Sequence, residues 1–250
     1  MARVVGIIPA RYESKRLPGK MLLDLGGKPL IIHTYERARE AKLLDRVIVA
    51  TDDRRIVEAV TKAGGEAVMT AAGHRSGSDR IAEIASTLEC DVVVNVQGDE
   101  ALIKPEVIDA AVRLLLDHPK AEMGTMACPI RTEDEYTDRN VVKVACAQDG
   151  EALYFSRAPI PHSKQGRFTS GLAAYRHIGL YAFRRDFLLV YTTLPTSSLE
   201  RAEDLEQLRA LEHGHCIVVG ITADHTSLNI DTPEDLERAR EYLCRKSTSS

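Results

Sequence analysis

The residues of this sequence that are best suited to chemistry follow its first apolar run, residues 4–8. Residues 9–20 bring together four cations, a hydroxyl and a glycine: Arg11, Ser14, Lys15, Arg16, Gly19 and Lys20. Four like charges in one short connection repel one another unless an anion lies between them, and guanidinium groups pair well with phosphate oxygens. The segment is neither a Walker A loop nor a GxGxxG turn. It indicates a polyphosphate-binding turn of another kind, and the alternative is a solvated basic loop.

Asp99 is the first of two candidate metal ligands. It belongs to the motif Gln97-Gly98-Asp99-Glu100, which directly follows a continuous apolar run at residues 92–96. Ligands of an open parallel sheet bind beyond the carboxyl ends of its strands, so we expect this carboxylate in the crevice. Mg²⁺ accepts one or two protein carboxylates and takes its other ligands from phosphates and water. A turn or a helix cap is the alternative role of Asp99.

Asp231 is the second candidate ligand, and its alternative role is to cap the last helix. Thr232 is the better N-cap, because Pro233 then takes the first helical position and Asp235 completes a pair that resembles a capping box. This assignment leaves Asp231 available for a ligand.

Polar residues in the second half of the chain form three further short motifs, at residues 154–157, 177–179 and 206–207. Their spacing alone indicates no function. His177 is expected to be a strand histidine with satisfied hydrogen bonds, and Gln207 an exposed helix residue. The pair Asp52-Asp53 is expected at the N-terminus of a helix rather than in a second acidic site.

Composition and charge argue against several classes of protein. The chain has 33 basic and 37 acidic residues, a net charge of −4, 5% aromatic residues and no tryptophan, which disfavours nucleic-acid binding. The apolar run near the start is too short to span a bilayer, so we expect neither a signal peptide nor a membrane anchor. Five cysteines without a CxxC pair and eight histidines without an HExxH pattern predict no disulfide framework and no zinc site. We expect a reducing, cytoplasmic compartment.

The elements that must position these residues alternate regularly in the first half of the chain. Short apolar runs are followed by amphipathic stretches, at residues 4–8, 30–41, 47–50, 56–63, 67–69, 81–86 and 92–96. The run at 92–96 is apolar at nearly every position, as a parallel strand covered on both faces requires. The pattern predicts an α/β fold with a doubly wound, mostly parallel, Rossmann-like sheet.

The second half of the chain is less regular. After a helix at residues 105–116, strands are predicted at 123–130, 141–145, 153–155 and 177–183, then a helix at 198–212, a strand at 215–219 and a last helix at 233–243. We therefore predict one domain over residues 1–250, with an antiparallel insertion at about 125–195.

Nine motifs of the sequence, in their order along the chain, resemble those of the 3-deoxy-manno-octulosonate (Kdo) cytidylyltransferases, the CMP-Kdo synthetases. They are IPARYESKRLPGK at residues 8–20, GKP at 27–29, VATD at 49–52, HRSGSDR at 74–80, VNVQGDE at 94–100, ALYFSR at 152–157, HIG at 177–179, LEQLR at 205–209 and DTPED at 231–235. The sequence departs from the family pattern at Ala101, where proline is usual, and at Ser78, where threonine is usual. Ala101 loosens the turn after Asp99, and Ser78 keeps the hydroxyl group. Neither departure argues against the activity, and both leave the sugar preference open.

The resemblance implies a nucleotidyltransferase fold and a role for each matching residue. It implies that seven residues lie at the nucleotide and its phosphates: Ala10, Arg11, Ser14, Arg16, Lys20, Ser76 and Gln97. It assigns the binding of Mg²⁺ to Asp99 and Asp231. These two residues form the catalytic group together with Arg11 and Lys20. It assigns the binding of the sugar acid to Arg157, His177 and Gln207. It also suggests a homodimer. The insertion would serve as a sugar-binding and dimerisation region, and residues 198–212 would contribute to the same dimer contact.

The implied reaction is attack of the sugar's anomeric hydroxyl on the α-phosphorus of CTP, which gives CMP-Kdo and pyrophosphate. Positioning and charge neutralisation dominate such a transfer, since no covalent enzyme intermediate is needed, and the sequence forces no general base. Two alternatives stay open at this point. One is a cytidylyltransferase for a Kdo analogue, such as the 8-amino sugar, or for another sugar acid, and the other is a module that binds CTP without turnover.

Overall fold

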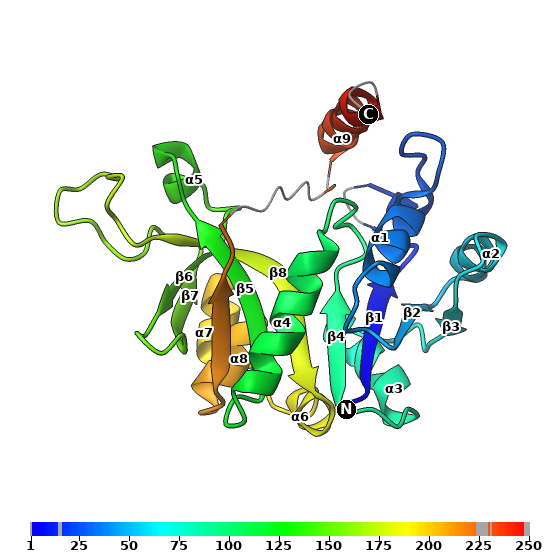
Figure 1. Ribbon diagram of the computed structural model, residues 1–250, viewed down its shortest axis with the longest axis horizontal. Coiled ribbons are helices and arrows are strands. Elements are labelled where there is room, and N and C mark those ends of the chain that lie inside the picture. The colour runs from blue at the N-terminus through cyan, green and yellow to red at the C-terminus, as the bar shows by residue number, and fades with distance from the viewer. Residues whose placement is uncertain (1, 15–16, 224–229, 231, 248–250) are drawn as a thin grey trace. The chain divides into compact units, whose positions relative to one another are not determined.

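The computed structural model describes residues 2–14, 17–223, 230 and 232–247, and it divides into two compact units (Figure 1). One unit consists of Met1–Asp109 with Thr226–Ser250, and the other is Ala110–His225. Each unit contributes several strands. The expectation of a single domain, with a sugar-binding and dimerisation insertion at about residues 125–195, stays a prediction.

The first unit contains a parallel sheet in the order β3-β2-β1-β4. Its elements are β1 (Val4–Ala10), α1 (Leu30–Arg39), β2 (Arg46–Thr51), α2 (Arg54–Lys62), β3 (Ala67–Met69), α3 (Gly77–Ser86) and β4 (Val92–Val96). Every residue of β1 and β4 is buried, which agrees with their continuous apolar sequence. The mostly parallel α/β fold predicted from the alternating runs is therefore confirmed.

The two ends of the first unit's chain share one apolar cluster. Leu25, Leu30 and Ala101 pack there with Ile230 and with Leu236 of helix α9 (Pro233–Ser247). Figure 1 shows α9 beyond the carboxyl ends of the parallel strands. The cluster therefore anchors the C-terminal helix on the side of the sheet where ligands of such folds bind.

The second unit is built around β5 (Met123–Pro129), which pairs antiparallel with β8 (Tyr175–Arg184) and parallel with β9 (Ile217–Ile221). The antiparallel strands β6 (Lys143–Cys146) and β7 (Ala152–Ser156) pair with each other, and β6 also pairs with β8. Short helices complete the unit: α5 (Glu133–Thr137), α6 (Arg185–Tyr191), α7 (Ser198–Glu203) and α8 (Gln207–Glu212). Helix α4 (Pro105–Asp117) begins in the first unit and ends in the second. These antiparallel strands confirm the predicted mixed character of the sheet.

The single helix predicted at residues 198–212 is wrong, because two helices occupy this range. Asp204 has a left-handed backbone with φ 53°, and it ends α7. The Leu205 amide donates to the Glu200 carbonyl, and α8 begins at Gln207. Leu205, in the connection between the two helices, and Leu208 of α8 are both buried, so the leucine spacing that predicted one helix continues across the break.

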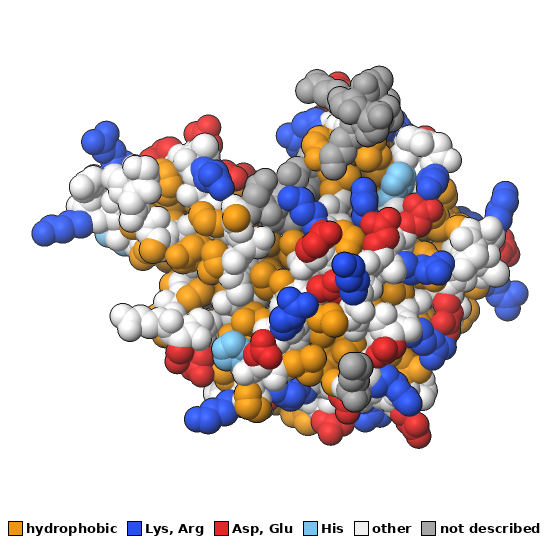
Figure 2. All heavy atoms as spheres, in the orientation of Figure 1, with side chains coloured by type: hydrophobic (Ala, Val, Ile, Leu, Met, Phe, Trp, Pro, Cys, Tyr) orange, Lys and Arg blue, Asp and Glu red, His pale blue; other side chains and the backbone are white. Residues whose placement is uncertain are grey.

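Charged side chains of both signs are interspersed over the face that Figure 2 shows, and no large single-sign area stands out on it. None of the helices in the described part of the chain combines the length and the apolar character that crossing a membrane requires.

A bulge in β5 and β8 encloses His177. The pairing shifts between Thr125 and Met126, and the Thr125 hydroxyl lies 2.6 Å from the Leu180 carbonyl and 2.9 Å from Nε2 of His177. A hydroxyl has one proton, so we infer that Thr125 donates to the carbonyl and His177 Nε2–H donates to Thr125. His177 is partly exposed, but aromatic rings enclose its imidazole. The burial of the imidazole lowers the pKa of His177 to about 3. His177 is therefore neutral near pH 7.

We predict that His177 makes folding pH-dependent. Below about pH 6.5 the unfolded chain protonates this imidazole while the folded protein does not, so the stabilisation is complete above pH 6.5 and is lost as pH falls toward 3. Between pH 7 and 5 this should remove about 1 to 2 kcal/mol of unfolding free energy. Urea unfolding of wild type, H177Q and H162Q at several pH values checks it, since His162 is exposed. Equal pH slopes for wild type and H177Q would contradict the assignment.

Candidate functional site

The basic turn begins where β1 ends. Ala10 is buried at 1% exposure as the last residue of the strand, and Arg11 is exposed directly after it. The turn is closed by backbone, since the Gly19 amide donates to the Tyr12 carbonyl at 3.2 Å. Ser14 accepts a weak bond from the Leu17 amide at 3.4 Å. The predicted phosphate ligand Arg16 lies outside the described residues.

Lys20 and Asp99 form the central contact of the candidate site. Lys20 opens the short 3₁₀ helix η1 (Lys20–Leu22), and its Nζ lies 2.6 Å from Oδ2 of Asp99. The Lys20 side chain is 6% exposed and that of Asp99 is 25% exposed. The two motifs that the sequence analysis chose separately, 79 positions apart, are therefore in direct contact.

Gly98 fixes the backbone before Asp99. Its carbonyl accepts a hydrogen bond from the buried Thr34 hydroxyl at 2.9 Å. A Cβ at this position would lie 3.0 Å from the Pro9 carbonyl oxygen and 3.1 Å from Sδ of Met21. The strand end of β4 can approach the end of β1 this closely only because residue 98 has no side chain. The Asp99 carboxylate consequently has a defined position beside the basic turn.

The donor set at this edge fits Mg²⁺. The Asp99 carboxylate supplies the hard oxygen atoms that this ion prefers, and the Lys20 ammonium already shows that the position is favourable for a cation. Within the described ranges, no group of three His, Cys, Asp or Glu side chains could hold a metal, so phosphate and water would have to complete the shell.

Asp231, the second predicted metal ligand, lies outside the described residues, but its neighbours do not. Ile230 is fully buried in the same apolar cluster as Ala101. Thr232 caps α9, since its hydroxyl accepts from the Asp235 amide at 3.2 Å and Asp235 accepts from the Thr232 amide at 2.9 Å. The predicted capping pair is thus confirmed, and the helix has its cap without Asp231.

Ser76 and Gln97, the remaining predicted nucleotide residues, lie near the ends of α3 and β4. Ser76 caps α3 in a capping box with Asp79, and a Cβ on the adjacent Gly77 would lie 3.3 Å from the Pro9 ring. Gln97 follows β4 directly and donates to the Asn95 side chain at 3.5 Å. The N-terminus of α3 therefore approaches the end of β1, beside the basic turn.

Asp52 and Asp53 have different roles. Asp53 is the N-cap of α2, as predicted for the pair. Asp52 instead forms an ion pair with the buried Arg80 at 2.7 Å, and Arg80 also contacts the Thr70 hydroxyl. Sequence reasoning missed this contact, because a buried arginine on an amphipathic helix has the same spacing signal as an exposed one.

The three predicted sugar residues lie in the second unit. Arg157 is anchored at both ends: its guanidinium donates to the carbonyls of residues 139, 203 and 204, and its own carbonyl accepts from the buried Lys143 ammonium at 2.7 Å. His177 is the neutral imidazole of the β5–β8 bulge. Gln207 is only 4% exposed at the start of α8, so the expectation of an exposed residue is wrong. Contact of these residues with a sugar acid stays a prediction.

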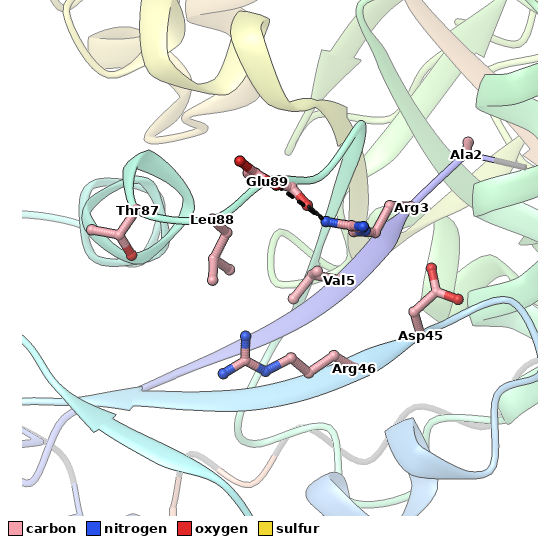
Figure 3. Close-up of a pocket in the computed structure, with 8 residues that line it drawn as sticks. All are labelled: Ala2, Arg3, Val5, Asp45, Arg46, Thr87, Leu88 and Glu89. Carbon is pink, nitrogen blue, oxygen red and sulfur yellow. Dashed lines mark hydrogen bonds and ion pairs between the residues drawn. The ribbon is translucent and has the colours of Figure 1, made fainter.

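A hollow of about 570 Å³ lies at the opposite end of the first sheet (Figure 3). Figure 3 shows Arg3, just before β1, bonded to Glu89, with Arg46 and Asp45 from the start of β2 nearby. These residues are at the amino ends of the strands, whereas the basic turn and Asp99 are at the carboxyl ends. The hollow is therefore separate from the candidate site.

Comparisons with known proteins agree with one another. The model of the cytidylyltransferase family matches residues 5–219. A 3-deoxy-manno-octulosonate cytidylyltransferase of Syntrophotalea carbinolica is 49% identical over 246 residues, with 96% of this chain and 98% of the relative covered. The corresponding protein of Syntrophus aciditrophicus is 50% identical over 246 residues, covering 97% and 98%.

Solved structures give the same result. A CMP:2-keto-3-deoxy-manno-octonic acid synthetase complexed with CTP superposes with a TM-score of 0.92 at 40% identity, covering 98% of this chain and all of the other. A cytidylyltransferase from Leptospira borgpetersenii, 20% identical with a TM-score of 0.63, shares the fold. The chain belongs to the cytidylyltransferases and, within them, to the 3-deoxy-manno-octulosonate cytidylyltransferase family.

Proposed function

We propose that the protein transfers CMP from CTP to the anomeric hydroxyl of Kdo, giving CMP-Kdo and pyrophosphate, the activated sugar for lipopolysaccharide biosynthesis. The observation that carries this proposal is the Lys20–Asp99 contact at the carboxyl ends of β1 and β4, in a chain that shares 40% identity with a CTP-bound synthetase. The contact supports a phosphate-binding role for Lys20 beside a metal-binding role for Asp99.

The nucleotide is bound by the cations of the turn. Arg11 is exposed and has a planar guanidinium for phosphate oxygens, and Lys20 is a compact point charge held at the base of the turn. Asp99, together with Asp231, would hold Mg²⁺, which neutralises the charge that develops at the α-phosphate and pyrophosphate. A cation held by Asp99 would take the place of the Lys20 ammonium as partner of this carboxylate, and Lys20 would then bind phosphate. Positioning and charge neutralisation are then the main contributions of the protein to catalysis.

The sugar acid is held by Arg157, His177 and Gln207 in this proposal. Because His177 is neutral, it contributes hydrogen bonding and shape, and the charge that meets the sugar carboxylate has to come from a cation such as Arg157. The backbone anchors of Arg157 support a fixed position for this side chain.

We also propose that the enzyme acts as a homodimer in the cytoplasm. Exposed apolar side chains in the region predicted for dimerisation, Leu153 at 64% and Val190 at 49%, support a partner on this part of the chain. Cys90, Cys128, Cys146 and Cys216 are not in disulfides, which suits a reducing compartment.

The proposed reaction is tested by pyrophosphate release. We expect release with CTP, Mg²⁺ and Kdo, weaker release with UTP, and little with purine triphosphates. Kdo should be preferred over its 8-amino analogue and over sialic acid in a side-by-side comparison. Preference for the 8-amino sugar would assign a different substrate, and equal turnover with ATP and CTP would overturn the cytidylyl specificity.

Asp231 and Thr232 provide a matched pair of variants for the metal site. We predict that D231N lowers activity by orders of magnitude with little change in Tm, because it removes a charge from the metal shell. T232A should cost about 1 kcal/mol of stability through loss of the α9 cap and leave turnover largely intact. Thermal unfolding and turnover at limiting Mg²⁺ check both. Normal turnover of D231N under these conditions would remove Asp231 from the metal site.

A further inference from the structure

We propose that Tyr12 and Arg55 form a stacked pair that positions the nucleotide-binding cations Arg11 and Lys20 for CTP. Arg55 is a positioning residue in this account, acting through Tyr12 rather than on the reacting atoms. The inference rests on the proposed function, since it names what orders the nucleotide side of that site.

Arg55 is held in place over the ring of Tyr12. Its guanidinium carbon lies 3.4 Å from the centroid of the Tyr12 ring. The same guanidinium is held by a fork of two bonds to Asp53, from Nε at 2.9 Å and from a terminal nitrogen at 2.7 Å. Asp53 is itself fixed as the N-cap of α2, where it accepts from the Arg55 amide. The ring of Tyr12 is therefore tied to the start of a helix.

Tyr12 also lies against Gly19, near the end of the basic turn. Gly19 has φ +67°, a backbone conformation that side chains rarely adopt. A Cβ there would lie 3.2 Å from the Tyr12 hydroxyl and 3.4 Å from its Cζ. The Gly19 amide also donates to the Tyr12 carbonyl. One aromatic residue thus contacts both the helix anchor and the end of the basic turn.

Tyr12 and Gly19 are the sequence neighbours of the two cations proposed to bind the nucleotide. Arg11 directly precedes Tyr12, and Lys20 directly follows Gly19. Holding Tyr12 and Gly19 together fixes the separation of the two cations before CTP arrives. Preorganisation of this kind improves affinity, because less conformational freedom is lost on binding.

The stack acts through shape rather than through charge. Asp53 offsets the charge of Arg55, and the Arg55 guanidinium holds the pKa of the Asp53 carboxyl below its usual range. The pair therefore adds little net attraction for a triphosphate. Lysine would keep the charge at position 55 but has no plane to stack on the ring and no fork for the carboxylate.

The neighbouring position provides a matched control. Arg54 is exposed on the same helix, so R54A removes one positive charge one residue away from the stack. Tyr12→Phe keeps an aromatic ring for the guanidinium, whereas Tyr12→Leu removes it.

The test is calorimetric binding of CTP with Mg²⁺ to wild type, R55A, R55K, Y12L, Y12F and R54A, with KM for CTP and for Kdo measured in parallel. We expect R55A, R55K and Y12L to raise the Kd and KM for CTP by about 3- to 10-fold, the range of a cation–π contact. Y12F and R54A should stay within about twofold, and KM for Kdo should not change. Calorimetry reports on the stack even if Kdo proves not to be the substrate.

Two results would overturn the proposal. The first is wild-type CTP affinity in both R55A and Y12L, which would show that the turn is ordered without the stack. The second is a loss in R55A that R55K restores, which would assign Arg55 a role through charge. If Y12L melts more than a few degrees below wild type, R55A and R55K decide the test, because both leave the Tyr12 ring in place. If R55A also melts early, R55K alone decides it, and wild-type CTP affinity in R55K then overturns the proposal.

Discussion

The arrangement of the candidate site depends on one interaction, the ion pair of Lys20 with Asp99 at 2.6 Å. Lys20 is 5% exposed, and a buried ammonium is costly unless a charged partner and hydrogen bonds compensate for its lost hydration. Asp99 provides the charged partner. The same carboxylate suits Mg²⁺ and the same ammonium suits phosphate, so the ligands can take over the partners that the two residues provide for each other.

The fold of the first unit makes this pair possible. β1 and β4 are adjacent and parallel, so the polar residues that follow them emerge at the same edge of the sheet. Gly98 allows the two strand ends to approach closely, and the apolar cluster that joins Ala101 to Ile230 connects the C-terminal segment to the same edge. Gly98 thereby sets the position of the Asp99 carboxylate, since a Cβ at residue 98 would lie 3.0 Å from the Pro9 carbonyl oxygen.

Much of the fold could be predicted from the sequence, because the evidence is local. Continuous apolar runs identified buried parallel strands, and the spacing of Thr232, Pro233 and Asp235 identified the cap of α9. The break at Asp204 escaped prediction because a left-handed aspartate leaves the leucine periodicity intact.

The candidate site could be predicted as a set of residues but not as a set of contacts. The motifs and family resemblance selected Lys20 and Asp99, yet only the structure shows them paired across 79 positions. The stack of Tyr12 on Arg55, the burial of Gln207 and the pair Asp52–Arg80 also depend on tertiary packing. No sequence pattern distinguishes a side chain in such a contact from one in solvent.

The affinity of D99N for CTP, measured by calorimetry with and without Mg²⁺, tests the central claim most directly. If Lys20 and Asp99 exchange partners on ligand binding, D99N should bind metal-free CTP at least as tightly as wild type, because a carboxylate that repels phosphate and competes with it for the Lys20 ammonium is gone. It should also lose most of the affinity that Mg²⁺ adds to the wild type, about 10- to 100-fold for a charge-assisted contact. An equal loss of CTP affinity with and without Mg²⁺ would contradict the account and reduce the pair to a structural contact.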